Sequence, residues 1–582
     1  MKGFLCVLQD KDADRLITRI SKHENTLIEG ADGFVNFKPV TIRQCRYLIH
    51  FQGELYNRKE LCQDLTLAGW DCLQVDYAEL IAYAYVQWGK SCLYHLNGAF
   101  ALVIYERGEL FAAKDHMGLK PLFYARCKNS GLILADSIAG ILADGMIEPI
   151  VDASGIREIF ALGPSLSEDK TLYRDIHALP MGSYLIAKHN NIRVKNYYRP
   201  TTKPHLDSFN ETVEKVRFLV EDAIIRQGEN SNACFLSGGL DSSIITAVCA
   251  KSHPNLKTYS LDYEGNSENF VGNMYQVSLD KPFIQEMVDR YESHHTLLTI
   301  TQKELIDMLK PALIARNLPG MADVDASLLW MCQQVKDDHE NIILGGECSD
   351  EVFGGYPWFY KPELKDLDSF PWLRSMDERI DLLHESIRGF GYHDYMQKQY
   401  DDTVRDIIFL DEDSEADKRA RIHTMICLRW FMQTLVTRQI TMGNAADLNV
   451  RSPFADVRII DYVYNIPWEM RYYKEEEKGI LRTAFEDILP ASIAHRKKNP
   501  YPKTHNPLYT ELIKERMREV YRDADSVIHM LFDDKRLKEL IESGGAAFKL
   551  PWYGQLMSGP QLLAYLYQLD LWVKQYHVKF ML

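Results

Sequence analysis

The chain has 582 residues, of which 46% are hydrophobic and 26% charged, a composition typical of a globular protein with at least two domains. The formal net charge of −15 argues against a nucleic-acid-binding surface. The 11 cysteines show neither C-x-x-C pairs nor zinc-type spacing, so we expect reduced thiols in a cytoplasmic protein. The first apolar run ends before Asp10, and no segment approaches membrane-spanning length, so we expect neither a signal peptide nor a membrane partner.

The first 200 residues are predicted to be mostly β. Apolar and aromatic runs of strand length occupy residues 47–51, 99–105 and 121–124, and helical spacing of apolar residues predicts a helix over 76–88. The polar stretch 199–205 contains two prolines and is the best candidate for a linker. We therefore predict one domain over residues 1–200 and a second over 201–582.

The second domain is predicted to be α/β. An amphipathic helix begins near Ser208, and strands such as 258–261 and 342–344 alternate with helical segments. This alternation predicts a parallel sheet with ligand sites at the carboxyl ends of its strands. After about residue 375 the pattern indicates a largely helical part.

The most informative stretch is S-G-G-L-D-S-S, residues 237–243, between an apolar strand and an apolar helix. A strand, a tight turn and a helix place backbone N–H groups where they can hold phosphate oxygens. Gly238 and Gly239 let the backbone approach an anion, the serines add hydroxyl donors, and Asp241 offers a hard ligand for Mg²⁺. The pattern is neither G-x-x-x-x-G-K-[S/T] nor G-x-G-x-x-G. The alternative, an ordinary glycine-rich turn, does not explain five specified residue types in this context.

A second motif, L-G-G-E-C-S-D-E-V-F-G-G-Y, spans residues 344–356 and follows another apolar strand. Its carboxylates would be costly in a core, so we expect them to face a polar site or solvent. One interpretation makes Asp350 a second Mg²⁺ ligand and Glu347 an acid/base group. The other interpretation is a charged surface loop.

The first motif resembles the pyrophosphate loop of ATP pyrophosphatases, and the two motifs together resemble the glutamine-hydrolysing asparagine synthetases. The likeness covers both halves of the chain and includes residues 318–325, 450–454, 495–505 and 551–562. It implies an α/β protein with an N-terminal Ntn-type αββα sandwich. An ATP-pyrophosphatase domain with a parallel sheet and a largely helical C-terminal part would follow.

The resemblance also implies roles for individual residues. ATP and Mg²⁺ would be the cofactors, Asp241 and Asp350 the metal ligands, and Glu347 and Lys498 the catalytic residues. Without the family, Lys498 would be better interpreted as one more solvated lysine in a basic run. Glu347 favours intermolecular amide formation over ring closure, because related β-lactam synthetases have tyrosine there. The implied nucleotide-binding residues are Leu236, Ser237, Gly238, Gly239, Leu240, Asp241, Ser242, Ser243, Leu261 and Gly346.

The N-terminal half departs from the family at its nucleophile. The family has a cysteine directly after the initiator methionine, with its freed α-amino group as the base. Lys2 stands at this position here, and its size also disfavours removal of Met1. Cys6 cannot replace the nucleophile because its nitrogen lies in a peptide bond, so we expect it to be a small buried hydrophobe.

Other glutaminase positions differ as well. The asparagine of the oxyanion hole is replaced by Gln52, and the aspartate that would bind the α-amino group of glutamine falls on Tyr77. The family arginine for the α-carboxylate lies in a stretch that is shortened here, between Phe34 and Arg46. We therefore predict that the glutaminase fold is retained and that glutamine is not hydrolysed.

The synthetase half departs near residues 437–454, where two acids and an arginine of the family are absent, and where Asn449 replaces a glutamate. Gly345 replaces a serine. These changes leave three hypotheses. The first is an AMP-forming amide ligase that joins free ammonia or another amine to an aspartate-like carboxylate. The second keeps this chemistry for another acceptor, through amidation of a sugar acid or coupling or cyclisation of a peptide-like or natural-product substrate. The third is a non-catalytic scaffold. A homodimer and, for the catalytic alternatives, a separate ammonia donor are the macromolecular partners that we consider.

Overall fold

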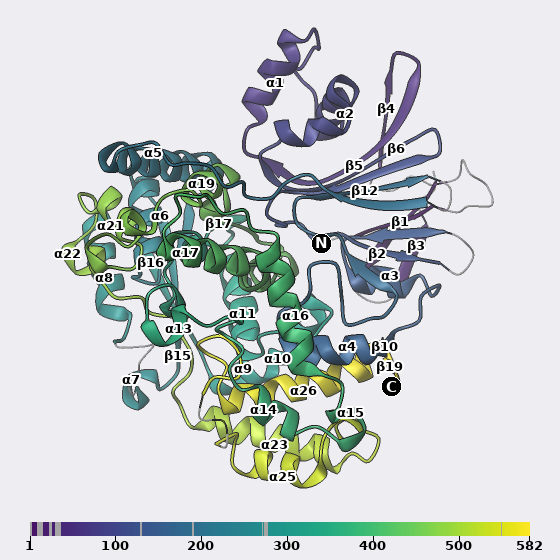
Figure 1. Cartoon of the computed structure of the whole chain (residues 1–582), viewed down its shortest axis with the longest axis vertical. Helices are drawn as coiled ribbons and strands as arrows, with labels where there is room; N and C mark the ends of the chain where they lie inside the picture. Colours follow the sequence, from purple (N-terminus) through teal and green to yellow (C-terminus); the bar gives the residue numbers. More distant parts are fainter. Residues whose placement is uncertain are drawn as a thin grey trace. The chain divides into compact units, whose positions relative to one another are not determined.

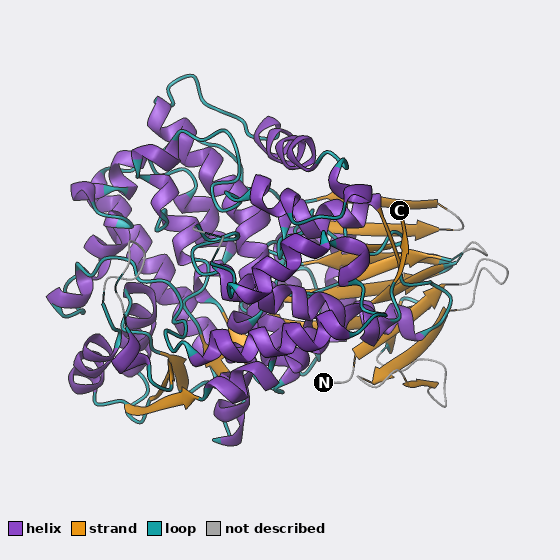
Figure 2. Cartoon of the chain, turned by 90° about the horizontal axis from the view of Figure 1, so that it is seen from below, coloured by secondary structure: helices purple, strands orange, loops and turns teal. Residues whose placement is uncertain are grey.

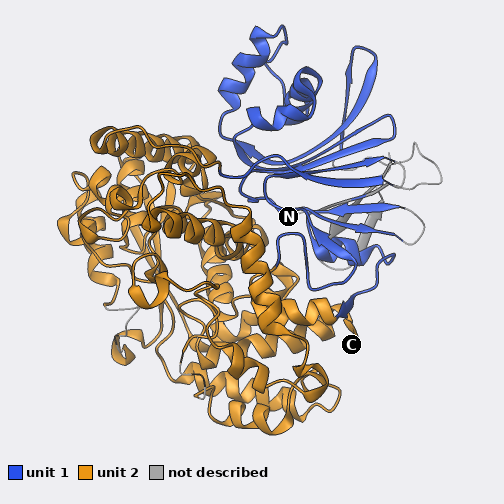
Figure 3. Cartoon of the chain, viewed as in Figure 1, with its two compact units in different colours: residues 1–152, 167–200 blue, residues 153–166, 201–582 orange. Residues whose placement is uncertain are grey.

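The structure of the chain is a computed structural model. It describes residues 3–8, 16–22, 26–29, 37–127, 131–188, 191–270, 272, 278–546, 548 and 550–582. Two compact units are present, one of residues 1–152 and 167–200 and the other of residues 153–166 and 201–582 (Figure 3). The predicted division into functional domains at residue 200 stays a prediction.

The first unit contains two six-stranded sheets whose pairings are antiparallel. One sheet has the order β11-β8-β9-β1-β2-β3, with strands Ile176–Ala178, Phe123–Arg126, Leu132–Ala135, Gly3–Leu8, Leu16–Lys22 and Thr26–Glu29. The other has the order β13-β12-β7-β6-β5-β4, with strands Asn191–Asn196, Ser183–Lys188, Glu109–Lys114, Gly98–Glu106, Cys45–Leu55 and Lys38–Ile42.

One apolar cluster joins the two sheets of this unit. It contains Leu132 and Leu134 from the first sheet and Val103 and Leu185 from the second. Cys6 belongs to the same cluster and is fully buried, which confirms its prediction as a small buried hydrophobe, and burial raises the pKa of its thiol. The sheets therefore pack face to face.

Helices cover the outer faces of this sandwich. α1 (Arg58–Leu67) and α2 (Tyr77–Trp88) share a core with the β4–β6 side of the second sheet (Figure 1), and α3 (Ile138–Ala143) contacts β9, β1 and β8. α2 begins where predicted because Asp76 accepts a hydrogen bond from the Glu79 N–H at 3.0 Å in a capping box. The predicted αββα sandwich is confirmed.

The second unit is built on a parallel sheet in the order β16-β15-β14-β17-β18. The strands are His294–Ile300, Lys257–Tyr263, Ala233–Phe235, Ile342–Leu344 and Asn449–Arg451. α5 (Phe209–Gly228) and α6 (Leu240–Ala250) contact each other and the sheet, as do α11 (Asp323–Asp337) and α18 (Met432–Ala445). The parallel α/β prediction is confirmed.

The chain after residue 375 is largely helical, as expected, and Figure 2 distinguishes helices from strands by colour throughout the chain. Its longer helices are α16 (Tyr392–Arg405), α17 (Glu415–Ile426), α18, α23 (Leu508–Arg522), α25 (Asp534–Glu542) and α26 (Gly559–Tyr576). Within the described residues, none of the helices combines the length and the apolar character that crossing a bilayer requires.

Candidate active site

The turn between β14 and α6 has the strand–turn–helix geometry predicted from the sequence. The Ser237 and Ser242 hydroxyl oxygens lie 3.0 Å apart, and the Ser237 N–H donates to Ser242 Oγ at 3.1 Å. Gly238 has a φ of +67°, and a Cβ there would come within 2.8 Å of the Phe283 side chain. Only glycine fits at this position without displacing Phe283.

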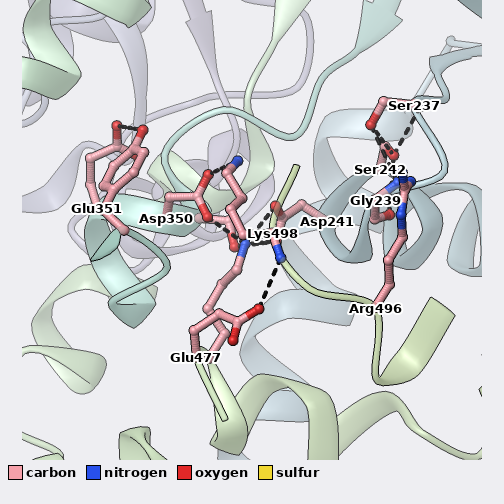
Figure 4. A network of polar contacts seen from close by, with 12 residues as sticks. Ser237, Gly239, Asp241, Ser242, Asp350, Glu351, Glu477, Arg496 and Lys498 are labelled. Atoms are coloured by element: carbon pink, nitrogen blue, oxygen red, sulfur yellow. Dashed lines mark hydrogen bonds and ion pairs between the residues drawn. The ribbon is translucent and has the colours of Figure 1, made fainter. Parts of the chain in front are cut away.

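The buried Arg496 holds this turn in place. Its Nη1 donates to the Gly238 carbonyl at 2.9 Å, and its Nη2 pairs with Asp280 at 2.6 Å (Figure 4 shows Arg496 beside the turn). The guanidinium also lies 3.9 Å from the centre of the Phe283 ring. The turn is therefore held in one shape by contacts that need no ligand.

A pocket opens at the carboxyl ends of β14, β15 and β17, as expected for a parallel sheet. Predicted site residues from four separate segments line it: Leu236, Ser237, Asp241, Ser242, Leu261, Gly346, Glu347, Asp350 and Lys498. Tyr259, Met321, Phe431 and Leu435 add apolar walls. Their roles toward a nucleotide stay predictions, but the structure brings these residues together.

Four other predicted nucleotide-binding residues do not line the pocket. Gly238 and Gly239 shape the turn behind it, while Leu240 and Ser243 are buried within α6. The Ser243 N–H donates to the Gly239 carbonyl at 3.1 Å and so belongs to the first turn of the helix. These residues build the turn, and a direct contact with phosphate stays a prediction for them.

Asp241, Asp350 and Lys498, which line the pocket, form a charged cluster with the buried Lys478. Lys478 Nζ lies 2.8 and 2.7 Å from the two carboxylate oxygens of Asp241 and 2.6 Å from Asp350 Oδ1. Lys498 Nζ pairs with the other oxygen of Asp350 (Figure 4). Burial alone would raise the pKa of Asp350, but the two ammonium groups outweigh it and hold that pKa well below its ordinary value.

Lys498 is not a solvated surface lysine. Its side chain is 21% exposed and paired with Asp350, and its backbone N–H donates to Glu477 Oε1 at 3.0 Å. Glu477 is in turn held by Arg482 at 2.7 Å. Lys498 therefore lies at the pocket, where the family resemblance implies it should be, and its interpretation as a solvated surface lysine is wrong.

The acidic pair suits Mg²⁺ only together with further ligands. Asp241 and Asp350 lie within reach of a single nitrogen atom, so one small cation could contact both. No group of three or more histidine, cysteine, aspartate or glutamate side chains suited to a metal occurs in the described part of the chain. Because Mg²⁺ is commonly bound by one or two carboxylates plus substrate phosphates, the residues fit a metal that arrives with a nucleotide.

Glu347 is held in the pocket by a buried arginine. Arg438 of α18 donates to Glu347 Oε1 at 2.6 Å, and its guanidinium lies 4.9 Å from the centre of the Tyr501 ring. The Arg438 side chain is 2% exposed, whereas that of Glu347 is 26% exposed. Glu347 can therefore meet a substrate while its orientation is fixed from behind.

Sequence reasoning missed both Lys478 and Arg438. Lys478 ends the charged run E-E-E-K, which is typical of a solvated turn, and Arg438 lies in the segment where two acids and an arginine of the family are absent. Neither residue carries a local signal for its partner. The surrounding family motif was the one available clue for Arg438.

Glu351 differs from the other carboxylates of its motif. Glu347 and Asp350 line the pocket, but Glu351 is buried and accepts a hydrogen bond from the Tyr356 hydroxyl at 2.8 Å. Burial, together with the nearby charges of Asp350 and Glu347, raises its pKa from 4.5 to about 8. The surface-loop interpretation of this motif is wrong, and so is the expectation that all three carboxylates face a polar site or solvent.

We expect Glu351→Gln to weaken the pH dependence of stability. Because the folded state holds the Glu351 proton more tightly than the unfolded state, this group's contribution is fully present below pH 4.5 and is lost as pH rises to about 8. Glutamine cannot ionise, so the free energy of unfolding of the variant should not show the decrease, on the order of a few kcal/mol, that ionisation of Glu351 causes in the parent chain as pH rises. Urea unfolding from pH 5 to 9 measures this. The exposed Glu363→Gln serves as control, and equal slopes for Glu351→Gln and the parent chain would contradict the assignment.

Comparisons with known proteins agree with this geometry. The family described as asparagine synthase matches residues 215–574, and the one described as glutamine amidotransferase domain matches residues 34–198. Asparagine synthetase [glutamine-hydrolyzing] 3 of Bacillus subtilis (strain 168) is 40% identical over 566 residues, which cover 96% of this chain and 92% of that protein. Asparagine synthetase [glutamine-hydrolyzing] 1 of the same organism is 26% identical over 85% of this chain and 83% of its own length. Asparagine synthetase B [glutamine-hydrolyzing] of Escherichia coli (strain K12) is 24% identical over 82% of this chain and 74% of its own length. The chain therefore belongs to the asparagine synthetase family, whose members are ligases that form carbon–nitrogen bonds while converting ATP to AMP and pyrophosphate.

Proposed function

We propose that this protein is an AMP-forming amide ligase that adenylates an aspartate-like carboxylate and transfers free ammonia or another amine to it, without hydrolysing glutamine. One observation carries the proposal. Asp241, Asp350 and Lys498 come from distant parts of the sequence and meet beside the 237–243 turn in one pocket. A scaffold protein has no need of such an arrangement.

In the proposed reaction, the acceptor carboxylate attacks the α-phosphorus of ATP, pyrophosphate leaves, and the amine then displaces AMP from the acyl group. The turn at Ser237 would hold phosphate oxygens through its N–H groups and hydroxyls. Lys498 would stabilise negative charge that develops on the reacting phosphate. Bound Mg²⁺, held by Asp241 and Asp350, would screen the phosphate charge.

Glu347 is placed to handle a proton of the incoming amine. Its carboxylate reaches the pocket while Arg438 fixes it at 2.6 Å, so an ionised Glu347 can accept a proton as the amide forms. A positioned base is required because an attacking amine must lose a proton before the amide is neutral.

Two features of the first unit support the absence of glutamine hydrolysis. The Gln52 amide donates to Asp136 Oδ2 at 3.4 Å, so a neighbouring carboxylate engages the group that replaces the oxyanion-hole asparagine. Tyr77 stacks on Phe51 with ring centres 4.9 Å apart and lies under Arg58, so it offers no carboxylate for an α-amino group. Lys2, at the nucleophile position, lies outside the described residues.

A second candidate is the same chemistry on a different acceptor. Where the family places charged side chains on the helix before Met442, this chain has a buried Ile440 and a Thr441 whose hydroxyl donates to the Thr437 carbonyl at 2.6 Å. Next to them, Gln439 donates to Ser452 Oγ at 3.0 Å. Of these three residues Gln439 lines the pocket, and the loss of the family's charges beside it favours acceptors with fewer charged groups than aspartate.

One assay tests these candidates. The purified chain should form AMP and pyrophosphate with ATP, Mg²⁺, an acceptor and ammonium, and glutamine should neither replace ammonium nor be hydrolysed to ammonia. Product with aspartate supports the first candidate, and product only with other carboxylates, such as sugar acids or peptides, supports the second. Glutaminase turnover clearly above background would refute the loss of that activity, and a chain that binds no ATP would be a scaffold.

A further inference from the structure

We propose that Lys478 is a resident counter-ion of the metal site, which neutralises Asp241 and Asp350 in the nucleotide-free protein and must leave them before a divalent cation can bind. Metal binding would then depend on the nucleotide. This inference rests on the proposed function, because it takes the pocket to be the site of ATP and Mg²⁺.

The position of the Lys478 ammonium is the first argument. It lies 2.7 Å from Asp241 Oδ2 and 2.6 Å from Asp350 Oδ1, and its side chain is 2% exposed. It thus fills the space between the two carboxylates that a shared divalent cation would need. A metal and a buried ammonium cannot occupy that space together, because their charges repel strongly where water is scarce.

The charge balance of the cluster of two aspartates and two lysines is the second argument. Two carboxylates face two ammonium groups, so the cluster is neutral without any ligand. A divalent cation alone would leave this cluster with excess positive charge. A cation that arrives with a triphosphate brings compensating negative charge, and it also gives the displaced lysine a new partner in the phosphate oxygens.

The two aspartates depend on Lys478 to different degrees. Asp350 is also paired with Lys498, whereas Asp241 has Lys478 and a hydrogen bond from Ser349 Oγ at 2.6 Å. Removal of the Lys478 charge therefore acts mainly on Asp241, whose carboxylate becomes available to another cation. A neutral residue in place of Lys478 therefore shows whether the Lys478 ammonium is what keeps a metal from Asp241.

The backbone around Lys478 is held in an uncommon conformation. Lys474, Glu475 and Lys478 have φ values of +57°, +57° and +58° in the segment between α20 (Trp468–Arg471) and α21 (Gly479–Phe485). Gly479 packs so closely that a Cβ there would lie 2.4 Å from the Tyr473 carbonyl oxygen. Residues other than glycine rarely adopt such φ values, and clusters of them occur at active sites, ligand clamps and switch regions.

Lys478→Met tests the inference, with Mn²⁺ as the metal probe. Mn²⁺ binding is measured without nucleotide, by titration calorimetry and by the electron paramagnetic resonance signal of free Mn²⁺. We expect Lys478→Met to bind Mn²⁺ at least ~10-fold more tightly than the parent chain. Lys474→Met is the matched control, because Lys474 is an exposed lysine with the same backbone conformation in the same segment, and its Mn²⁺ affinity should not change.

The parent chain provides a second measurement that needs no substitution. Its Mn²⁺ affinity, after subtraction of the Mn²⁺ that the analogue binds in a protein-free sample, should rise by at least ~10-fold when α,β-methylene-ATP, which cannot be cleaved between its first two phosphates, is present. Equal Mn²⁺ affinity with and without this analogue, when the analogue itself binds, would overturn the inference. So would a folded Lys478→Met chain that binds Mn²⁺ no more tightly than the parent. A parent chain that binds no analogue at all would instead refute the proposed function, and the Mn²⁺-only comparison would still decide whether Lys478 blocks the acidic pair.

Discussion

Asp241→Asn should abolish ATP-dependent pyrophosphate release while the protein stays folded. Asparagine keeps the size of the side chain and an oxygen that can accept the Ser349 hydroxyl, which donates to Asp241 at 2.6 Å. It removes the negative charge that a metal requires, and it leaves Lys478 with Asp350 as its remaining carboxylate partner. We expect the rate to fall by ~10³-fold or more. A coupled pyrophosphate assay with saturating ATP and Mg²⁺ measures the loss.

The control for this experiment is Asp289→Asn, on the exposed side of α8 (Lys281–Tyr291). This change also removes one negative charge, so it separates the local effect from the effect of net charge. Thermal unfolding of both variants confirms that they fold. Normal pyrophosphate release by Asp241→Asn would refute the metal assignment.

Lys498→Ala should lower the rate of pyrophosphate release by at least ~10²-fold. The ammonium group lies at the pocket, paired with Asp350, and can shift toward a phosphate without leaving its own backbone anchor at Glu477. A cation at this point stabilises charge in the transition state of adenylation more than in the ground state, so the rate should fall more than the affinity for ATP. Steady-state rates at saturating ATP, together with separate measurement of ATP binding, distinguish the two effects.

Lys497→Ala is the matched control, because Lys497 is the exposed neighbour in the same basic run. It should retain the parent rate. If Lys498→Ala loses less than ~10-fold, the role of Lys498 is to neutralise Asp350 and not to stabilise the reaction.

The sequence predicted the elements that local physics specifies. The apolar strand expected before the 237–243 turn is Ala233–Phe235, and the helix expected over 76–88 begins with its Asp76 capping box. The strand expected over 121–124 begins at Phe123, since Pro121 lacks the N–H group that a strand residue donates. Periodicity, capping residues and turn residues act over a few positions, and they can therefore be recognised in a single sequence.

The parts of the site that sequence reasoning missed depend on contacts between distant positions. Lys478 lies 237 positions after Asp241, and Arg438 lies 91 after Glu347, so nothing near either residue indicates its partner. Glu351 was expected to face a polar site or solvent, yet the helix of its own motif turns it toward Tyr356 while Asp350 faces the pocket. Tertiary packing decides which of two neighbouring carboxylates is buried, and tertiary packing cannot be predicted from the local pattern of one sequence.

Arg496 has a practical consequence for redesign of this enzyme. Because Arg496 ties the Gly238 carbonyl to Asp280 and lies two positions before Lys498, it fixes the shape of the pocket at the end where we propose that adenylation occurs. The neutral residues Gln439, Ile440 and Thr441 lie on α18, a separate helix. A mutant library aimed at new acceptors can therefore diversify positions 439–441 while Arg438, which fixes Glu347, and the 237–243 turn stay unchanged.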